Sequence, residues 1–198
     1  MRHGWIYIYE IPPATARFDE LAEFLELRGL SLAYPPSGSV IRLSPVGDQI
    51  MTSKEELRDR FRDSSEVAFN FYLDSSTNVF CSFDRLDEAT WREGYSLDGK
   101  NEEQCSLVID TIVDLFRKRA QQNSAFAFIA DRYAELHRHC HWDDFVLGNA
   151  PSPPEWPLLL GFSRSFEKIS AVPRQMYNAE EHSQYVLFGK KVKSGRAE

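Results

Sequence analysis

The stretch EVAFNFYLDSSTNVFCSFDRLD, residues 66–87, decides the fold of this chain. Its first part places Val67, Phe69 and Phe71 at every second position, which is the spacing of a strand with one side in a core. A polar run of Asp, Ser, Thr and Asn follows and is typical of a turn. A second strand is then expected to run through Phe83, so the stretch predicts a β-hairpin.

The clearest helix of the sequence follows this hairpin at residues 102–119. Asn101 and Gln104 stand at the spacing of a reciprocal helix cap. Apolar residues recur every three or four positions, and the basic residues 117–119 suit the negative end of the helix dipole. A further helix is predicted at residues 18–28, with Gly29 as its left-handed stop. Another runs from Ser53 to about Phe61, where Ser53 and Glu56 form a second reciprocal cap, and a last one from about Asp131 to about His139.

The remaining pattern predicts the fold class. Strands are expected near residues 5–9, 40–44, 124–130, 157–163 and 184–190. Hairpin strands with helices at irregular intervals predict an α+β fold, with a mostly antiparallel sheet of six to eight strands and four helices packed against it.

The domain organisation is expected to be simple. A length of 198 residues fits one domain over residues 1–198, with a frayed basic tail at 190–198. The segments WIYIYE and FAFIAD are loosely alike and each precedes a helical pattern. This resemblance leaves open two similar halves that meet near residues 98–104.

Charge and composition narrow the classes of partner and compartment. The formal net charge of −7 argues against nucleic acid and anionic membranes as partners and is compatible with a basic protein. Three cysteines without a C-x-x-C pair indicate a reduced protein. The N-terminal apolar stretch is too short for a signal-peptide core, and no run approaches the roughly 20 apolar residues of a membrane helix. We therefore expect a cytoplasmic protein.

The negative charge is concentrated in residues 84–114, which carry nine acidic and three basic residues. This region begins with a polar connection between the predicted hairpin and the predicted helix of residues 102–119. The connection is longer than is needed to join these two elements. Acidic residues can steer a basic partner, and aromatic residues can supply binding energy. The predicted partner-binding residues are Asp84, Asp87, Glu88, Trp91, Glu93 and Tyr95. The alternative interpretation is a solvated acidic surface with Trp91 turned back into the core.

These features favour a non-enzymatic, protein-binding function. Small acidic proteins without catalytic motifs include immunity and antitoxin-type inhibitors, which occlude the basic active site of a partner such as a cognate toxin enzyme. The analogy rests on composition, because no stretch of the chain identifies a family. A structural domain with an ordinary surface is a further possibility, and the sequence leaves the oligomeric state open.

A second hypothesis rests on ELHRHCHWDDF, residues 135–145. His137, His139, His141 and Asp144 could serve a metal-dependent enzyme or a zinc-binding domain, because zinc takes three or four converging nitrogen, sulfur or oxygen ligands. In an extended chain the three histidines would share one side. In a helix His139 would point away from His137, His141 and Asp144. The competing interpretation is a histidine-rich helix end, and on that view the protein has no cofactor.

Overall fold

The computed structural model describes residues 4–11, 17–121, 125–131, 139–153 and 155–191 of the chain. The strands are β1 (Trp5–Ile11), β2 (Val40–Leu43), β3 (Gln49–Thr52), β4 (Glu66–Tyr72), β5 (Asn78–Arg85), β6 (Trp91–Ser96), β7 (Ala125–Asp131), β8 (Leu159–Ser163), β9 (Tyr177–Glu181) and β10 (Tyr185–Lys190). The α-helices are α1 (Arg17–Glu26), α2 (Lys54–Asp63), α3 (Glu102–Ala120) and α4 (His139–Leu147). Two short 3-10 helices, Glu167–Ala171 and Arg174–Met176, precede β9.

The ten strands form one antiparallel sheet in the order β3-β2-β4-β5-β6-β1-β7-β8-β10-β9. Strand β1 lies in the middle of this sheet, between β6 and β7, although it comes first in the chain. The α+β class is confirmed, and the sheet is larger than expected. The three additional strands are β3 and β9, which are the two edges, and β6, which lies inside the region predicted to be a connection.

The local signals at several helix ends are confirmed. Ser53 and Glu56 cap α2 reciprocally, and Asn101 and Gln104 do the same for α3. Gly29 has a φ of 85° just after α1, the left-handed conformation that glycine adopts most readily at a helix end. The cap at Asn101, five residues after the end of β6, fixes the first residue of α3.

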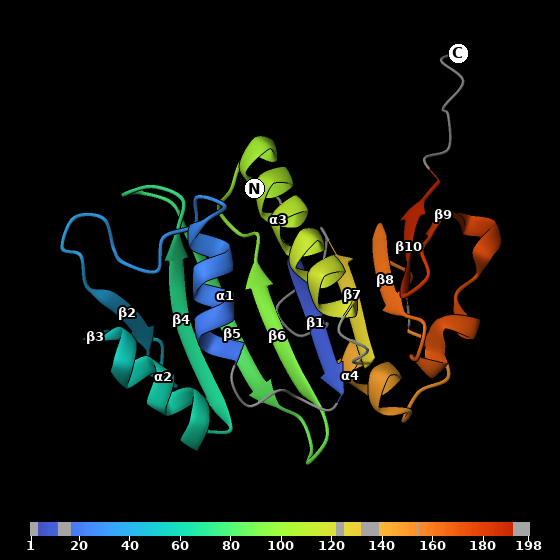
Figure 1. Cartoon of the computed structure of the whole chain (residues 1–198), viewed down its shortest axis with the longest axis horizontal. Coiled ribbons are helices and arrows are strands. Elements are labelled where there is room, and N and C mark those ends of the chain that lie inside the picture. Colours follow the sequence, from blue (N-terminus) through green and yellow to red (C-terminus); the bar gives the residue numbers. More distant parts are fainter. Residues whose placement is uncertain (1–3, 12–16, 122–124, 132–138, 154, 192–198) are drawn as a thin grey trace.

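The sheet has hydrophobic residues on both faces. Helices α1, α2 and α3 cover one face, where Ile6 and Ile8 of β1 join their core (Figure 1). Tyr7 and Tyr9 point to the opposite face and pack in a second cluster with Trp142 of α4. In the part of the chain that the structure describes, no helix is long and apolar enough to cross a membrane.

Helix α3 runs diagonally across the middle of the sheet, and β8, β10 and β9 extend beyond it (Figure 1). Leu187 of β10 is buried and joins the core beneath the helices. Asn178 and Glu180 of β9 are exposed. Helix α3 therefore stands above the sheet on one side, and the outer strands β8, β10 and β9 continue past it. The candidate site lies between the side of α3 and these strands.

Candidate binding groove

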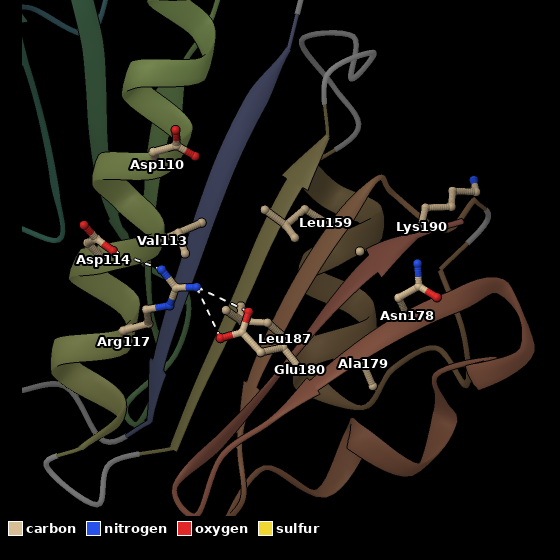
Figure 2. Close-up of a pocket in the computed structure, with 11 residues that line it drawn as sticks. Asp110, Val113, Asp114, Arg117, Leu159, Asn178, Ala179, Glu180, Leu187 and Lys190 are labelled. Atoms are coloured by element: carbon tan, nitrogen blue, oxygen red, sulfur yellow. Dashed lines mark hydrogen bonds and ion pairs between the residues drawn. The ribbon is translucent and has the colours of Figure 1, made fainter. Parts of the chain in front are cut away.

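A groove of about 480 Å³ lies between α3 and the last three strands of the sheet. Figure 2 shows Asp110, Asp114 and Arg117 along α3 on one side and Glu180 of β9 on the other. The floor comes from β8 and β10. The groove therefore joins residues that lie up to 80 positions apart in sequence, from Asp110 to Lys190.

The α3 wall follows from the helical repeat. Asp110, Val113, Asp114 and Arg117 are spaced by three or four residues, so they lie along one side of the helix. Phe116, on the adjacent side, is fully buried against the sheet. A single helix thus presents an apolar side to the core and a mostly charged side to the groove.

The floor of the groove is apolar, and it is closely packed at Gly161 but open at Gly189. At Gly161 of β8, a Cβ atom would lie 2.8 Å from the side chains of Leu187 and Phe116, so this position is already closed. At Gly189 of β10, a Cβ atom would meet no atom within 4 Å. The groove is therefore open above Gly189, and Leu159 of β8 contributes a half-buried apolar side chain beside it.

Ion pairs hold the two walls in position. Arg117 Nη1 donates to Asp114 at 3.1 Å, and Arg117 Nη2 donates to both carboxylate oxygens of Glu180 at 3.4 Å. Asp114 also pairs with Arg28. Burial would raise the pKa of Asp114, but hydrogen bonds from the two arginines outweigh it and lower that pKa.

The rim of the groove keeps one carboxylate unpaired. Asp110 is exposed and has no ion-pair partner among the residues that the structure describes. Lys190, across the groove, uses its Nζ to donate to the carbonyl oxygen of Trp156 at 2.8 Å. That carbonyl is neutral, so within the described residues the groove offers a ligand one unpaired carboxylate on its α3 wall and one unpaired cation on β10.

The sequence-predicted binding residues do not form one surface. Asp87 and Glu88 are exposed in the turn between β5 and β6. Trp91 opens β6 and is half-buried against the core beneath the helices. Asp84 lies on β5, mostly buried, and accepts hydrogen bonds from Arg92. Only the turn residues have the full exposure that the prediction assumed.

The predicted exposure of Glu93 and Tyr95 is wrong. Residues 91–96 form strand β6 rather than a connection, and Glu93 and Tyr95 point beneath α3. They are 5% and 1% exposed. The Tyr95 hydroxyl donates to Glu93 Oε2 at 2.8 Å, and burial, with the negative Glu93, raises the pKa of Tyr95 well above its ordinary value.

Arg119 of α3 completes this buried cluster, and sequence reasoning missed its role. Its Nη1 donates to Glu93 Oε1 at 2.6 Å, and its side chain is fully buried. Among described residues its Nε and Nη2 have no hydrogen-bond partner. The three consecutive basic residues at the end of α3 suggested only favourable interactions with the helix dipole, so nothing local separated Arg119 from its neighbours.

A second ionic cluster fastens α4 to the opposite face. Arg92 bonds to Asp84 at 2.6 Å and to Asp143 of α4 at 2.5 Å. The Tyr9 hydroxyl donates to Asp143 at 2.8 Å. Burial, reinforced by the Asp143 charge, raises the pKa of Tyr9 well above its ordinary value. These mutual contacts satisfy the cluster internally and explain why Arg92 and Asp84 are unsuited to a binding surface.

The histidine stretch lies partly outside the described residues. His137 is outside them, and so are the side chains of His139 and His141. Most of the helix predicted from about Asp131 lies outside the described residues, and its expected end near His139 is wrong, because α4 (His139–Leu147) continues to Leu147. Asp144 is exposed on α4. Within the described portion, no group of three potential metal ligands converges, and the zinc hypothesis stays a prediction.

Comparisons with family models, with curated proteins and with solved structures find no match for this chain. The features of the molecule that bear on its function are the groove, the exposed acidic turn and the net negative charge.

Proposed function

We propose that this protein acts by binding another protein, as an inhibitor of the immunity or antitoxin type that occludes a basic partner. The groove between α3 and β9 is the observation that carries this proposal. An apolar side chain of a partner would fit above Gly189, and a basic side chain of the same partner would lie near Asp110.

The overall charge supports the same mechanism. A formal net charge of −7 attracts a basic protein over distances of several ångströms and raises the rate of association. Asp87 and Glu88 remain exposed and add to this field from the turn between β5 and β6. Inhibition would then be steric, because the bound protein covers the basic surface that its partner uses.

Two substitutions in the groove test the proposal. Gly189→Phe would fill the open floor without a backbone clash, and Asp110→Lys would reverse the unpaired charge. Both variants are expected to lose a partner that the wild-type protein captures from its native cells. The matched control is Glu103→Lys, which makes the same charge change on the same helix outside the groove.

The captured protein must then be purified and assayed with and without this chain. We expect a protein with an excess of lysine and arginine, whose activity falls on addition of the wild type and of Glu103→Lys. Addition of the Gly189→Phe variant is expected to leave the activity of the captured protein unchanged. Equal capture by all three variants, or a captured protein that is acidic, would rule out the groove as the inhibitory surface.

A further inference from the structure

The two edge strands of the sheet differ in how they face solvent. Strand β9 carries Glu180 and Glu181, and Glu181 pairs with Arg164 at 2.9 Å and Arg174 at 3.0 Å. Charged side chains on an edge discourage pairing with another strand. Strand β3, Gln49–Thr52, has no charged residue. Charged side chains therefore discourage strand pairing at the β9 edge of the sheet, whereas the β3 edge has none within its strand.

Strand β3 also exposes apolar surface on both of its sides. The Met51 side chain is 72% exposed and lies beside Ile41 in the pairing of β2 with β3. Ile50 is half-buried and points to the other face, where it lines a hollow of about 550 Å³ together with charged residues of α2 and Arg42. A neighbouring strand would cover both side chains, so the edge is suited to strand addition.

The charges around β3 favour a second copy of this chain as the occupant. Residues 40–64, which include β3 and α2, carry five acidic and five basic residues. Two copies of a chain with a formal net charge of −7 repel each other least where the local charge cancels. A surface with equal numbers of both signs can also be complementary to itself, as a two-fold interface requires.

We propose that β3 pairs antiparallel with β3 of a second copy, about a two-fold axis that passes through Met51. Directly opposed residues of an antiparallel pair point to the same face of a sheet. In this register Met51 opposes Met51 of the second copy, and Ile50 opposes its Thr52. The two sheets become continuous, and both apolar side chains of the edge are covered. This inference is independent of the proposed inhibitory function.

Sedimentation velocity over a range of concentrations tests the proposal. The wild type is expected to show a concentration-dependent dimer, and Met51→Lys is expected to weaken it about tenfold or more, because two like charges would then be opposed. The matched control is Ala179→Lys on the other edge strand, which should leave the dimer unchanged. A wild-type monomer at every concentration up to the solubility limit would overturn the proposal.

A cross-link tests the register itself. Opposed Cα atoms in an antiparallel pair lie roughly 4.5–5.5 Å apart, within the range that a disulfide spans. Met51→Cys, in a Cys140→Ala background, is expected to form a disulfide-linked dimer on mild oxidation, whereas Ala179→Cys is not. The native Cys81 and Cys105 are buried. Equal cross-linking at both edges, or a dimer that Met51→Lys leaves intact, would show that β3 is not the interface.

Discussion

Among the described residues, Arg119 is one of the largest side chains that the core encloses completely, and it is charged. It pairs with Glu93, which is itself 5% exposed. Removing both charges from water is expensive, and the attraction between them repays that cost only while both are present. Replacing one member of this pair is therefore expected to destabilise the folded state more than replacing both.

We predict that Arg119→Met lowers the free energy of unfolding by about 3–5 kcal/mol, because it leaves Glu93 buried without its cation. The double variant Arg119→Met with Glu93→Gln is expected to recover part of this loss. Urea unfolding of the wild type, both single variants and the double variant gives the coupling energy directly. Losses that simply add in the double variant would mean that the two charges are not coupled in the folded state.

The same pair shows why part of the candidate site could not be predicted. Glu93 and Tyr95 flank Gly94 in a polar stretch, which sequence patterns assign to a connection. Their burial depends on Arg119, a partner 26 residues further along the chain. Hydrophobic periodicity cannot detect a buried position that is filled by a charge with a remote partner.

At the scale of elements, the predictable parts are those with a local cause. The alternation in β4 and the reciprocal caps of α2 and α3 are properties of short stretches, and all were expected. Strands β3 and β9 were missed because edge strands are short and mostly exposed, so they lack an apolar pattern. Their existence depends on the neighbouring strand rather than on their own composition.

Strand β9 is tied to α3 through charge, and this gives a pH prediction. Hydrogen bonding to His182, together with the Arg117 charge, lowers the pKa of Glu180 below its ordinary value of 4.5. A carboxylate with a lowered pKa stabilises the folded state above that ordinary value, and the stabilisation is lost as the pH falls through the lowered pKa. We therefore expect stability to decline below about pH 4.5.

Thermal unfolding of the wild type and Glu180→Gln between pH 3 and pH 6 measures this contribution. The variant is expected to be the less stable protein near pH 6, and the difference should shrink as the pH falls through the lowered pKa of Glu180. High salt should reduce the difference, because Glu180 is half exposed to solvent. A constant difference across this range would assign the effect to packing rather than charge.

At the scale of the whole molecule, the groove is a product of topology. Its α3 wall and its β9 wall come together only because three sequential strands, β8, β9 and β10, are added outward from the centre of the sheet. No local pattern in residues 110–117 indicates what lies opposite them. The fold class followed from the order of patterns along the chain, whereas the position of the groove required the strand order.

The groove and the β3 edge lie at opposite ends of the sheet, which predicts that they act independently. Ten strands spaced by about 4.8 Å separate the two edges by roughly 40 Å. Met51→Lys is expected to change capture of the partner by less than about twofold, and Gly189→Phe to change the dimer constant by less than about twofold. Sedimentation and capture assays on both single variants and the double variant measure this.

The central position of β1 also constrains how the protein is made. Its backbone is complete once residue 11 has been synthesised, yet its neighbours β6 and β7 end only at residues 96 and 131. A nascent chain must therefore keep an apolar, aromatic strand from aggregating until residues 91–96 and 125–131 have been translated. Such long-range pairing slows folding. Early ribosomal products of this protein should consequently depend on chaperones until β7 emerges and closes the second side of β1.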